Sequence, residues 1–316
     1  MRFKNIIKPV AFLGIFVLIL AVVSLLFTPK ATDKGIEKED ANTIDYLVLG
    51  DSESYASIAP MEVWNEYGFT GYNLGVAAQR LQDTYYLLQR SLENQSPKVI
   101  MLETNLLHRS MKLHEEVGKV LNSIVKDKLA VYRHHDDWKK LNSWDIKSEK
   151  KNKRKLEENI FKGFHYGDGV RPYSKGNYVK ENNNVEEIKT VPMYYLNKIV
   201  ELCKEKNIKL ILYTSPSPVC WKYENHNAIK TFAKENELPF IDLNLKLSDL
   251  DIDWSKDTYD SGDHVNFSGA KKVTKYMSKY LSENTDLIDH RNDEKYDSWN
   301  KTWEEYLKLI NEKKSK

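Results

Sequence analysis

The stretch YLVLGDSESYASIAP, Tyr46 to Pro60, contains an apolar run that stops abruptly at Gly50-Asp51-Ser52. A short apolar run of this kind, bounded by turn residues, is typical of a buried strand. In α/β proteins, ligands bind beyond the carboxyl ends of the strands. The stretch therefore predicts a serine at the functional edge of a sheet.

Strand-like and helix-like segments alternate on the C-terminal side of this run. The predicted strands cover residues 45–49, 98–102, 209–213 and 240–243, and the predicted helices cover residues 76–92, 192–205, 224–235 and 268–281. Such alternation predicts an α/β domain whose parallel strands are joined by right-handed crossovers.

Composition excludes several classes of protein. The chain has 316 residues, 41% of them hydrophobic and 30% charged, which is enough for one sizeable core. Its formal net charge is +2, so it lacks the strong basic field of a nucleic-acid-binding protein. The sequence contains no glycine fingerprint for nucleotides or dinucleotides, and it implies no cofactor.

The N-terminus predicts a membrane anchor. Val10 to Phe27 is almost unbroken apolar sequence, preceded by Arg2, Lys4 and Lys8. As a helix this run would measure roughly 27 Å, close to the thickness of a bilayer core. The basic residues before it place the N-terminus in the cytoplasm and the rest of the chain outside. A cleaved signal peptide is the alternative, although the run is long for one and lacks an obvious cleavage site.

These features divide the chain into four parts. We expect residues 1–29 to form the cytoplasmic N-terminus and transmembrane anchor, 30–43 a polar tether, 44–285 the α/β domain that carries the serine, and 286–316 a tail rich in aromatic residues and lysine. The domain carries a charged insertion at about residues 107–191, which we expect to form helices over the active face. In the tail, the helical spacing of Trp299, Trp303 and Tyr306 predicts a helix packed on the domain, with contact to a membrane surface as the alternative.

A second polar segment, DTYDSGDHVNFSGAKKV from Asp257 to Val273, supplies a base for the serine. Serine oxygen is a poor nucleophile at neutral pH unless an imidazole held by a carboxylate accepts its proton. His264 provides the imidazole, and both Asp260 and Asp263 are close enough in sequence to orient it. A carboxylate adjacent to its histidine tends to point away from the ring, so we favour Asp260.

With these motifs the chain resembles the SGNH, or GDSL-type, hydrolase superfamily, whose fold is a three-layer α/β/α sandwich with a mostly parallel sheet. The resemblance implies that Ser52 is the nucleophile and an oxyanion-hole donor. It also implies that Gly75, in Tyr72-Asn73-Leu74-Gly75, and Asn105, in MLETNLLH, complete the oxyanion hole. The third family block usually reads Gly-x-Asn-Asp, whereas Glu103-Thr104-Asn105-Leu106 stands here. The usual Asp-x-x-His spacing is also absent, because Ser261 lies three residues before His264.

A single anchor and the HVNFSGA segment resemble the membrane-tethered branch of that superfamily. This branch includes the D-alanine transfer protein of teichoic-acid modification and companions of membrane-bound O-acyltransferases. The resemblance implies a serine esterase or acyltransferase that moves acetyl or D-alanyl groups to or from cell-envelope glycopolymers through an acyl-serine intermediate. The alternative is a catalytically inactive scaffold, or polymer-binding partner, of a membrane-bound acyltransferase.

The remaining reactive side chains give weaker signals. Cys203 and Cys220 are the only cysteines, and we expect two free thiols. His134-His135-Asp136-Asp137 contains residues able to bind metal, but neighbours on one segment seldom converge on one ion. We therefore expect no metal site.

Overall fold

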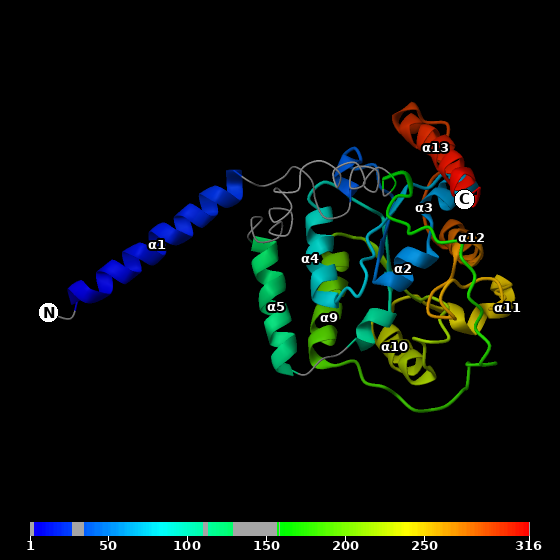
Figure 1. Ribbon diagram of the computed structural model, residues 1–316, viewed down its shortest axis with the longest axis horizontal. Coiled ribbons are helices and arrows are strands. Elements are labelled where there is room, and N and C mark those ends of the chain that lie inside the picture. Colours follow the sequence, from blue (N-terminus) through cyan, green and yellow to red (C-terminus); the bar gives the residue numbers. More distant parts are fainter. Residues whose placement is uncertain (1–2, 27–34, 110–112, 129–156, 158, 316) are drawn as a thin grey trace. The chain divides into compact units, whose positions relative to one another are not determined.

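We describe a computed structural model of the chain that covers residues 3–26, 35–109, 113–128, 157 and 159–315 (Figure 1). It divides into two compact units: residues 1–32 with 111–153, and residues 33–110 with 154–316. The catalytic segments predicted from sequence all belong to the second unit.

The first unit contains two described helices, α1 (Phe3–Leu26) and α5 (Leu113–Lys128). Over the described residues, we find no helix long and apolar enough to cross a bilayer, so the structure gives no support to the transmembrane helix predicted near the N-terminus. The segment His134 to Asp137 lies outside the described residues.

The second unit is built on a five-stranded parallel sheet in the order β2-β1-β3-β4-β5. The strands are β1 (Tyr46–Leu49), β2 (Gly71–Asn73), β3 (Val99–Glu103), β4 (Lys209–Thr214) and β5 (Phe240–Asp242). Four of them coincide with the strands predicted from sequence. The α/β class is thus confirmed, and β2 is an additional strand at the sheet edge.

Helices lie on both faces of the sheet (Figure 1). On one face, α4 (Leu81–Ser91) packs against α9 (Thr190–Glu205). On the other face, α12 (Phe267–Asn284) packs against α2 (Ser52–Ser57) and α3 (Pro60–Tyr67). The remaining described helices of this unit are η1 (Ile36–Lys38), η2 (Asn105–His108), α10 (Tyr223–Glu235), η3 (Leu243–Lys246), α11 (Leu247–Leu250), η4 (Glu294–Tyr296) and α13 (Asp297–Lys314).

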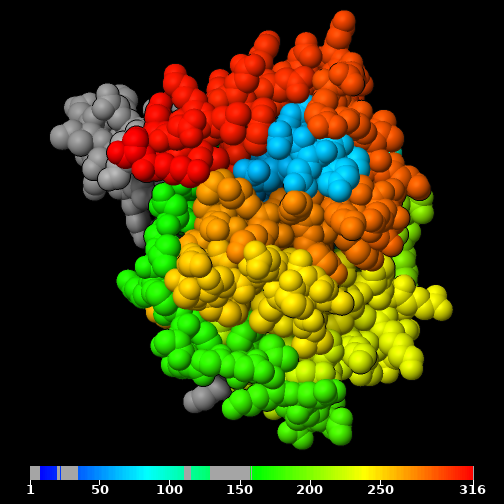
Figure 2. All heavy atoms as spheres, turned by 90° about the vertical axis from the view of Figure 1, so that its right-hand side faces the viewer, coloured from blue at the N-terminus to red at the C-terminus, as the bar shows by residue number. Residues whose placement is uncertain are grey.

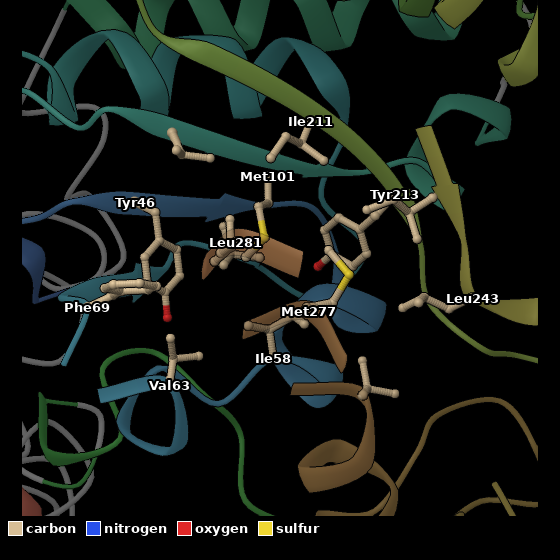
Figure 3. Packing of buried hydrophobic residues seen from close by; sticks show 14 of the residues in the cluster. Tyr46, Ile58, Val63, Phe69, Met101, Ile211, Tyr213, Leu243, Met277 and Leu281 are labelled. Carbon is tan, nitrogen blue, oxygen red and sulfur yellow. The ribbon is translucent and has the colours of Figure 1, made fainter. Parts of the chain in front are cut away.

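The core between the sheet and α12 follows the two-residue period of the strands (Figure 3). Tyr46, Met101 and Tyr213 come from three neighbouring strands and point to the same face of the sheet. They belong to one buried cluster with Met277 and Leu281 of α12. The apolar residues of α12 recur at helical spacing, so they line the face that covers the sheet. This packing fixes α12, and with it the loop that carries His264 just before the helix.

The C-terminal helix α13 packs on α3, as Figure 2 shows with α13 in red beside α3 in blue. Trp299 is buried with its ring 5.5 Å from that of Trp64, and the Tyr306 hydroxyl donates a hydrogen bond to Glu62 at 2.9 Å. The prediction that the tail packs on the domain is therefore confirmed.

Replacement of Trp299 by alanine should destabilise the protein by about 3–5 kcal/mol, because it removes a fully buried indole. Trp303, which lies on the same helix and is partly exposed, serves as the matched control. Trp303→Ala should cost less than about 2 kcal/mol. Urea unfolding of the full chain measures both changes, and equal losses would mean that the burial of Trp299 does not stabilise the domain.

Within the predicted insertion at about residues 107–191, α5 is helical, whereas residues 164–189 are extended. Residues 164–189 form a strap, drawn in green in Figure 2, that runs beside the yellow and orange loops after β5. Its backbone N–H groups at Arg171 and Tyr173 donate to the carbonyls of Thr258 and Trp254. These bonds fix the strap to the loop that leads to His264.

Candidate active site

The sheet topology places two polar strand ends side by side. The chain leaves β1 for β2 on one side, whereas β3, β4 and β5 follow on the other, so the strand order reverses between β1 and β3. Ligands of open α/β sheets bind at such a switch point, beyond the carboxyl ends of the strands. Here Gly50-Asp51-Ser52 follows β1, and Glu103 ends β3 just before Asn105.

The turn after β1 leaves no room for a side chain at Gly50. A Cβ there would lie 2.7 Å from Glu103 Cβ and 2.8 Å from Ser54 Cβ. The next residue, Asp51, is buried and caps α2, since its Oδ1 accepts the Glu53 N–H at 3.0 Å. Arg109 Nε donates to Asp51 Oδ2 and balances its charge. These contacts fix the backbone on which Ser52 stands.

Ser52 is the first residue of α2 and is 8% exposed. Across the described part of the chain, its hydroxyl makes no hydrogen bond to His264. The structure therefore places the predicted nucleophile at the switch point without joining it to the predicted base.

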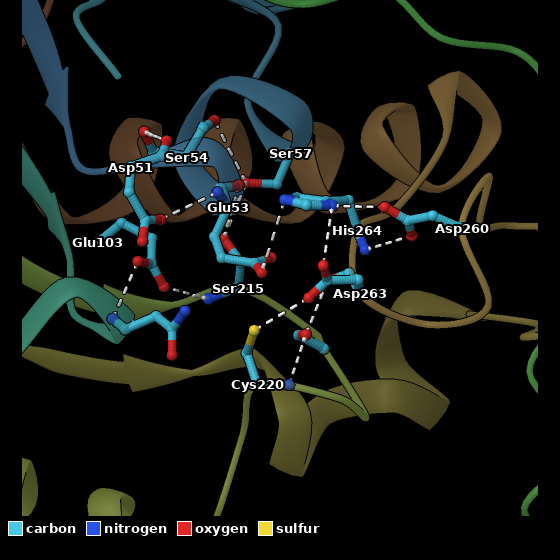
Figure 4. Close-up of polar contacts among 12 residues, drawn as sticks. Asp51, Glu53, Ser54, Ser57, Glu103, Ser215, Cys220, Asp260, Asp263 and His264 are labelled. Carbon is cyan, nitrogen blue, oxygen red and sulfur yellow. Dashed lines mark hydrogen bonds and ion pairs between the residues drawn. The ribbon is translucent and has the colours of Figure 1, made fainter. Parts of the chain in front are cut away.

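Asp260 holds His264 at two points (Figure 4). Its Oδ2 lies 2.6 Å from the ring Nδ1, and its Oδ1 accepts the backbone N–H of His264 at 2.8 Å. Asp263 Oδ2 is farther from Nδ1, at 3.8 Å. The Tyr259 ring stacks on the imidazole. The two ring planes are parallel within 2°, and the ring centroids are 5.6 Å apart. The ring is thus oriented by Asp260 through its Nδ1, and its Nε2 is left to face α2.

Glu53, which we did not single out in the sequence, faces that nitrogen. Its Oε1 lies 3.9 Å from His264 Nε2, and both atoms are buried without a hydrogen-bond partner among the described residues. The Glu53 side chain is only 3% exposed. Burial, and then the nearby charges of Glu103, Asp51 and Asp263, raise the pKa of Glu53 well above its usual value. This environment favours the protonated form of Glu53.

Replacement of Glu53 by glutamine should stabilise the fold more at pH 8 than at pH 5. The folded-state pKa of Glu53 is raised, so the folded protein binds more protons than the unfolded chain above about pH 4.5, and its stability falls as pH rises. Glutamine keeps the shape and removes this loss. We expect the gain in unfolding free energy to be larger at pH 8 by at least about 1 kcal/mol.

Urea unfolding of the full chain at the two pH values, in the presence of a chelator, makes this comparison. A difference between Glu53→Gln and wild type that does not change with pH would contradict the raised pKa.

The backbone N–H groups of Gly75 and Asn105 have partners in the structure, whereas the oxyanion donor predicted at Asn105 is its side-chain amide. The Gly75 N–H donates to Asn73 Oδ1 at 3.0 Å, and the Asn105 N–H donates to Glu103 Oε2 at 2.9 Å. Gly75 closely approaches α2, because a Cβ there would lie 2.1 Å from Ser54 Oγ. The Asn105 side chain lines a cavity of about 280 Å³ together with His108, Arg109, Glu186, Cys220, Lys222 and Asn225.

The two cysteines are free, as predicted. Cys203 is buried on α9. Cys220 reaches the site, where its Sγ donates to Asp263 Oδ1 at 2.9 Å. Burial, and then the charge of Glu53 and the bond to Asp263, raise the pKa of the Cys220 thiol. Sequence spacing gave no sign of this contact, because the two residues come from segments 43 positions apart.

No family model matches this chain, and no curated protein matches it. Several solved structures align with it at low similarity. A G-D-S-L family lipolytic protein from Desulfitobacterium hafniense DCB-2 aligns with a TM-score of 0.42 at 13% identity, covering 76% of this chain and 100% of its own. An acylhydrolase from Bacteroides fragilis NCTC 9343 aligns with a TM-score of 0.39 at 13% identity, covering 79% of this chain and 92% of its own. The acetyl xylan esterase AlAXEase aligns with a TM-score of 0.39 at 15% identity, covering 75% of this chain and 100% of its own. All three TM-scores are below 0.5.

Proposed function

We propose that this protein is a serine-dependent acyl-ester hydrolase or acyltransferase. The observation that supports this proposal is the Asp260–His264 pair. Asp260 fixes Nδ1 at 2.6 Å, and the buried, unpartnered Nε2 is turned toward the first turn of α2, where Ser52 stands. Acyl transfer through serine requires a carboxylate-held imidazole whose free nitrogen can reach the serine hydroxyl, and here that nitrogen faces the helix that begins with Ser52.

In the proposed reaction, Ser52 Oγ attacks the ester carbonyl while His264 Nε2 accepts its proton. His264 then returns the proton to the leaving alcohol, and an acyl-serine remains. Asp260 keeps the Nδ1–H in place and stabilises the imidazolium. The Ser52–His264 bond forms when substrate is bound, as catalytic hydrogen bonds often tighten only in the Michaelis complex. Water, or the hydroxyl of an acceptor, then releases the acyl group.

Hydrolysis of short-chain p-nitrophenyl esters by the purified full chain tests this proposal. We expect turnover that saturates with substrate and is lost when Ser52 or His264 is replaced by alanine. A folded protein with no turnover above the uncatalysed rate would contradict hydrolase activity.

The alternative is an inactive scaffold for a membrane-bound acyltransferase, and one observation favours it. His264 Nε2 faces Glu53 Oε1 instead of Ser52 Oγ. If Ser52→Ala and His264→Ala cells keep normal acylation of their envelope, the scaffold is the better description.

We further propose that the acyl group is acetyl or D-alanyl, that it is moved to or from an envelope glycopolymer such as a teichoic acid, and that a membrane-bound O-acyltransferase is the protein partner. This proposal rests on the sequence resemblance. Mass analysis of the acyl-serine formed in cells, compared with the Ser52→Ala variant, tests it: an acyl group other than these two would refute the choice.

We also propose that the second unit lies outside the cytoplasm. The support is the basic residues Arg2, Lys4 and Lys8 before the apolar run of residues 10–27. A reporter enzyme that is active only outside the cytoplasm should be active when it is fused to the C-terminus of this chain. Activity of a C-terminal reporter that works only in the cytoplasm would contradict the proposed location.

A further inference from the structure

Three side chains with carboxylate or thiol donors converge at the edge of the candidate active site, and His264 approaches one of them, Glu53 (Figure 4). Glu53 comes from α2, Cys220 from the loop after β4, and Asp263 and His264 from the loop before α12. Donor atoms of Glu53, Cys220 and Asp263 all lie within 4.8 Å of one another, and His264 Nε2 lies 3.9 Å from Glu53 Oε1. We call these four residues the donor cluster.

Glu53 and His264 point toward each other but are too far apart for a hydrogen bond. Within the described part of the chain, Glu53 Oε1 and His264 Nε2 are both buried and have no hydrogen-bond partner, and only 3% of the Glu53 side chain is exposed. A buried polar atom without a partner is costly, and a native structure usually supplies one. A separation of 3.9 Å suits two ligands of one metal ion, because each would bind it at about 2.0–2.2 Å.

The charges around the cluster also favour a cation. Among the described residues, Arg109 pairs with Asp51, whereas no lysine or arginine pairs with Glu53 or Asp263. The other ring nitrogen of His264, Nδ1, is hydrogen-bonded to Asp260. Metal-binding histidines are commonly oriented by a carboxylate in the same way.

We propose that the donor cluster binds one zinc ion. A thiolate, an imidazole nitrogen and carboxylate oxygens are the ligands that zinc takes in proteins, whereas magnesium and calcium prefer oxygen alone. Binding would replace the S–H···O bond from Cys220 to Asp263, and the thiol proton would pass to solvent.

Zinc at this position would compete with the proposed serine chemistry, on which this part of the inference rests. His264 Nε2 is the nitrogen that accepts the proton of Ser52, and it cannot do so while it binds a metal. The ion would therefore inhibit acylation of Ser52 reversibly.

Zinc titration of the purified, EDTA-treated full chain against a chromophoric chelator tests the site directly. We expect one zinc ion per chain in the wild type, and at least about 100-fold weaker binding for Cys220→Ala and Cys220→Ser. The serine variant keeps a hydroxyl that can bond to Asp263, so it controls for loss of that contact. Cys203→Ala, which removes the other thiol, should bind as the wild type does.

Wild-type protein that binds no stoichiometric zinc, or Cys220 variants that bind as tightly as the wild type, would overturn the site. These outcomes do not depend on esterase activity, so they separate a failure of the metal site from a failure of the proposed function.

A second experiment measures labelling of Ser52 by a fluorophosphonate with and without zinc, each variant compared with its own zinc-free rate. Zinc should slow labelling of the wild type at least about tenfold and leave the ratio for Cys220→Ala near one. Equal slowing in both proteins would overturn inhibition through the donor cluster.

Discussion

Ser52→Ala should lower ester hydrolysis by at least about 10⁴-fold, because it removes the atom that forms the acyl intermediate. The remaining rate would come from binding and from whatever donors hold the oxyanion. Initial rates with p-nitrophenyl acetate, measured over a range of substrate concentrations, give the loss in kcat/KM.

Ser54→Ala is the matched control for that variant. Ser54 belongs to the same motif and is fully buried, and its hydroxyl donates to the Asp51 carbonyl at 2.8 Å. The substitution removes one internal hydrogen bond and no proposed catalytic atom, so activity should stay within about tenfold of the wild type. Comparable losses in the two variants would mean that Ser52 has a structural role only.

Asp260→Asn and Asp263→Asn should differ clearly in their catalytic rates. An amide at residue 260 can no longer stabilise the imidazolium of His264, so we expect a loss of about 10³ to 10⁴-fold in kcat. Asp263 lies 3.8 Å from Nδ1 and bonds instead to Cys220, so its amide should cost less than about tenfold. Rates are compared with a chelator present, because Asp263 also belongs to the donor cluster.

The same two variants give a second readout. If Asp260 orients the ring, its amide should lower kcat more than it raises KM, since the effect is confined to the transition state. Equal and mild losses at both positions would remove the assignment of Asp260 as the triad acid.

Much of the sheet could be predicted from the sequence because its strands are short, continuous apolar runs. β1, β3, β4 and β5 fall where those runs predict them. β2 has only three residues, Gly71–Asn73, two of which disfavour strands, and it exists because it pairs with β1. The helices α2 and α3, of six and eight residues, are too short for a clear period.

The candidate site was only partly visible in the sequence. Sequence could place Ser52 and His264 at an α/β edge and could favour Asp260, whose contact with His264 depends on residues close in the chain. The approach of Glu53 to His264, and that of Cys220 to Asp263, joins segments that only the fold brings together. No local pattern marks such contacts, although Glu53 lies next to the predicted nucleophile.

The most direct test of an activated serine is the intact mass of the full chain after treatment with a fluorophosphonate, followed by peptide mapping. We predict one adduct, on Ser52, that is absent from Ser52→Ala and lost from His264→Ala. A folded wild-type protein that gains no adduct, or one that carries it on another residue, would contradict the proposed mechanism.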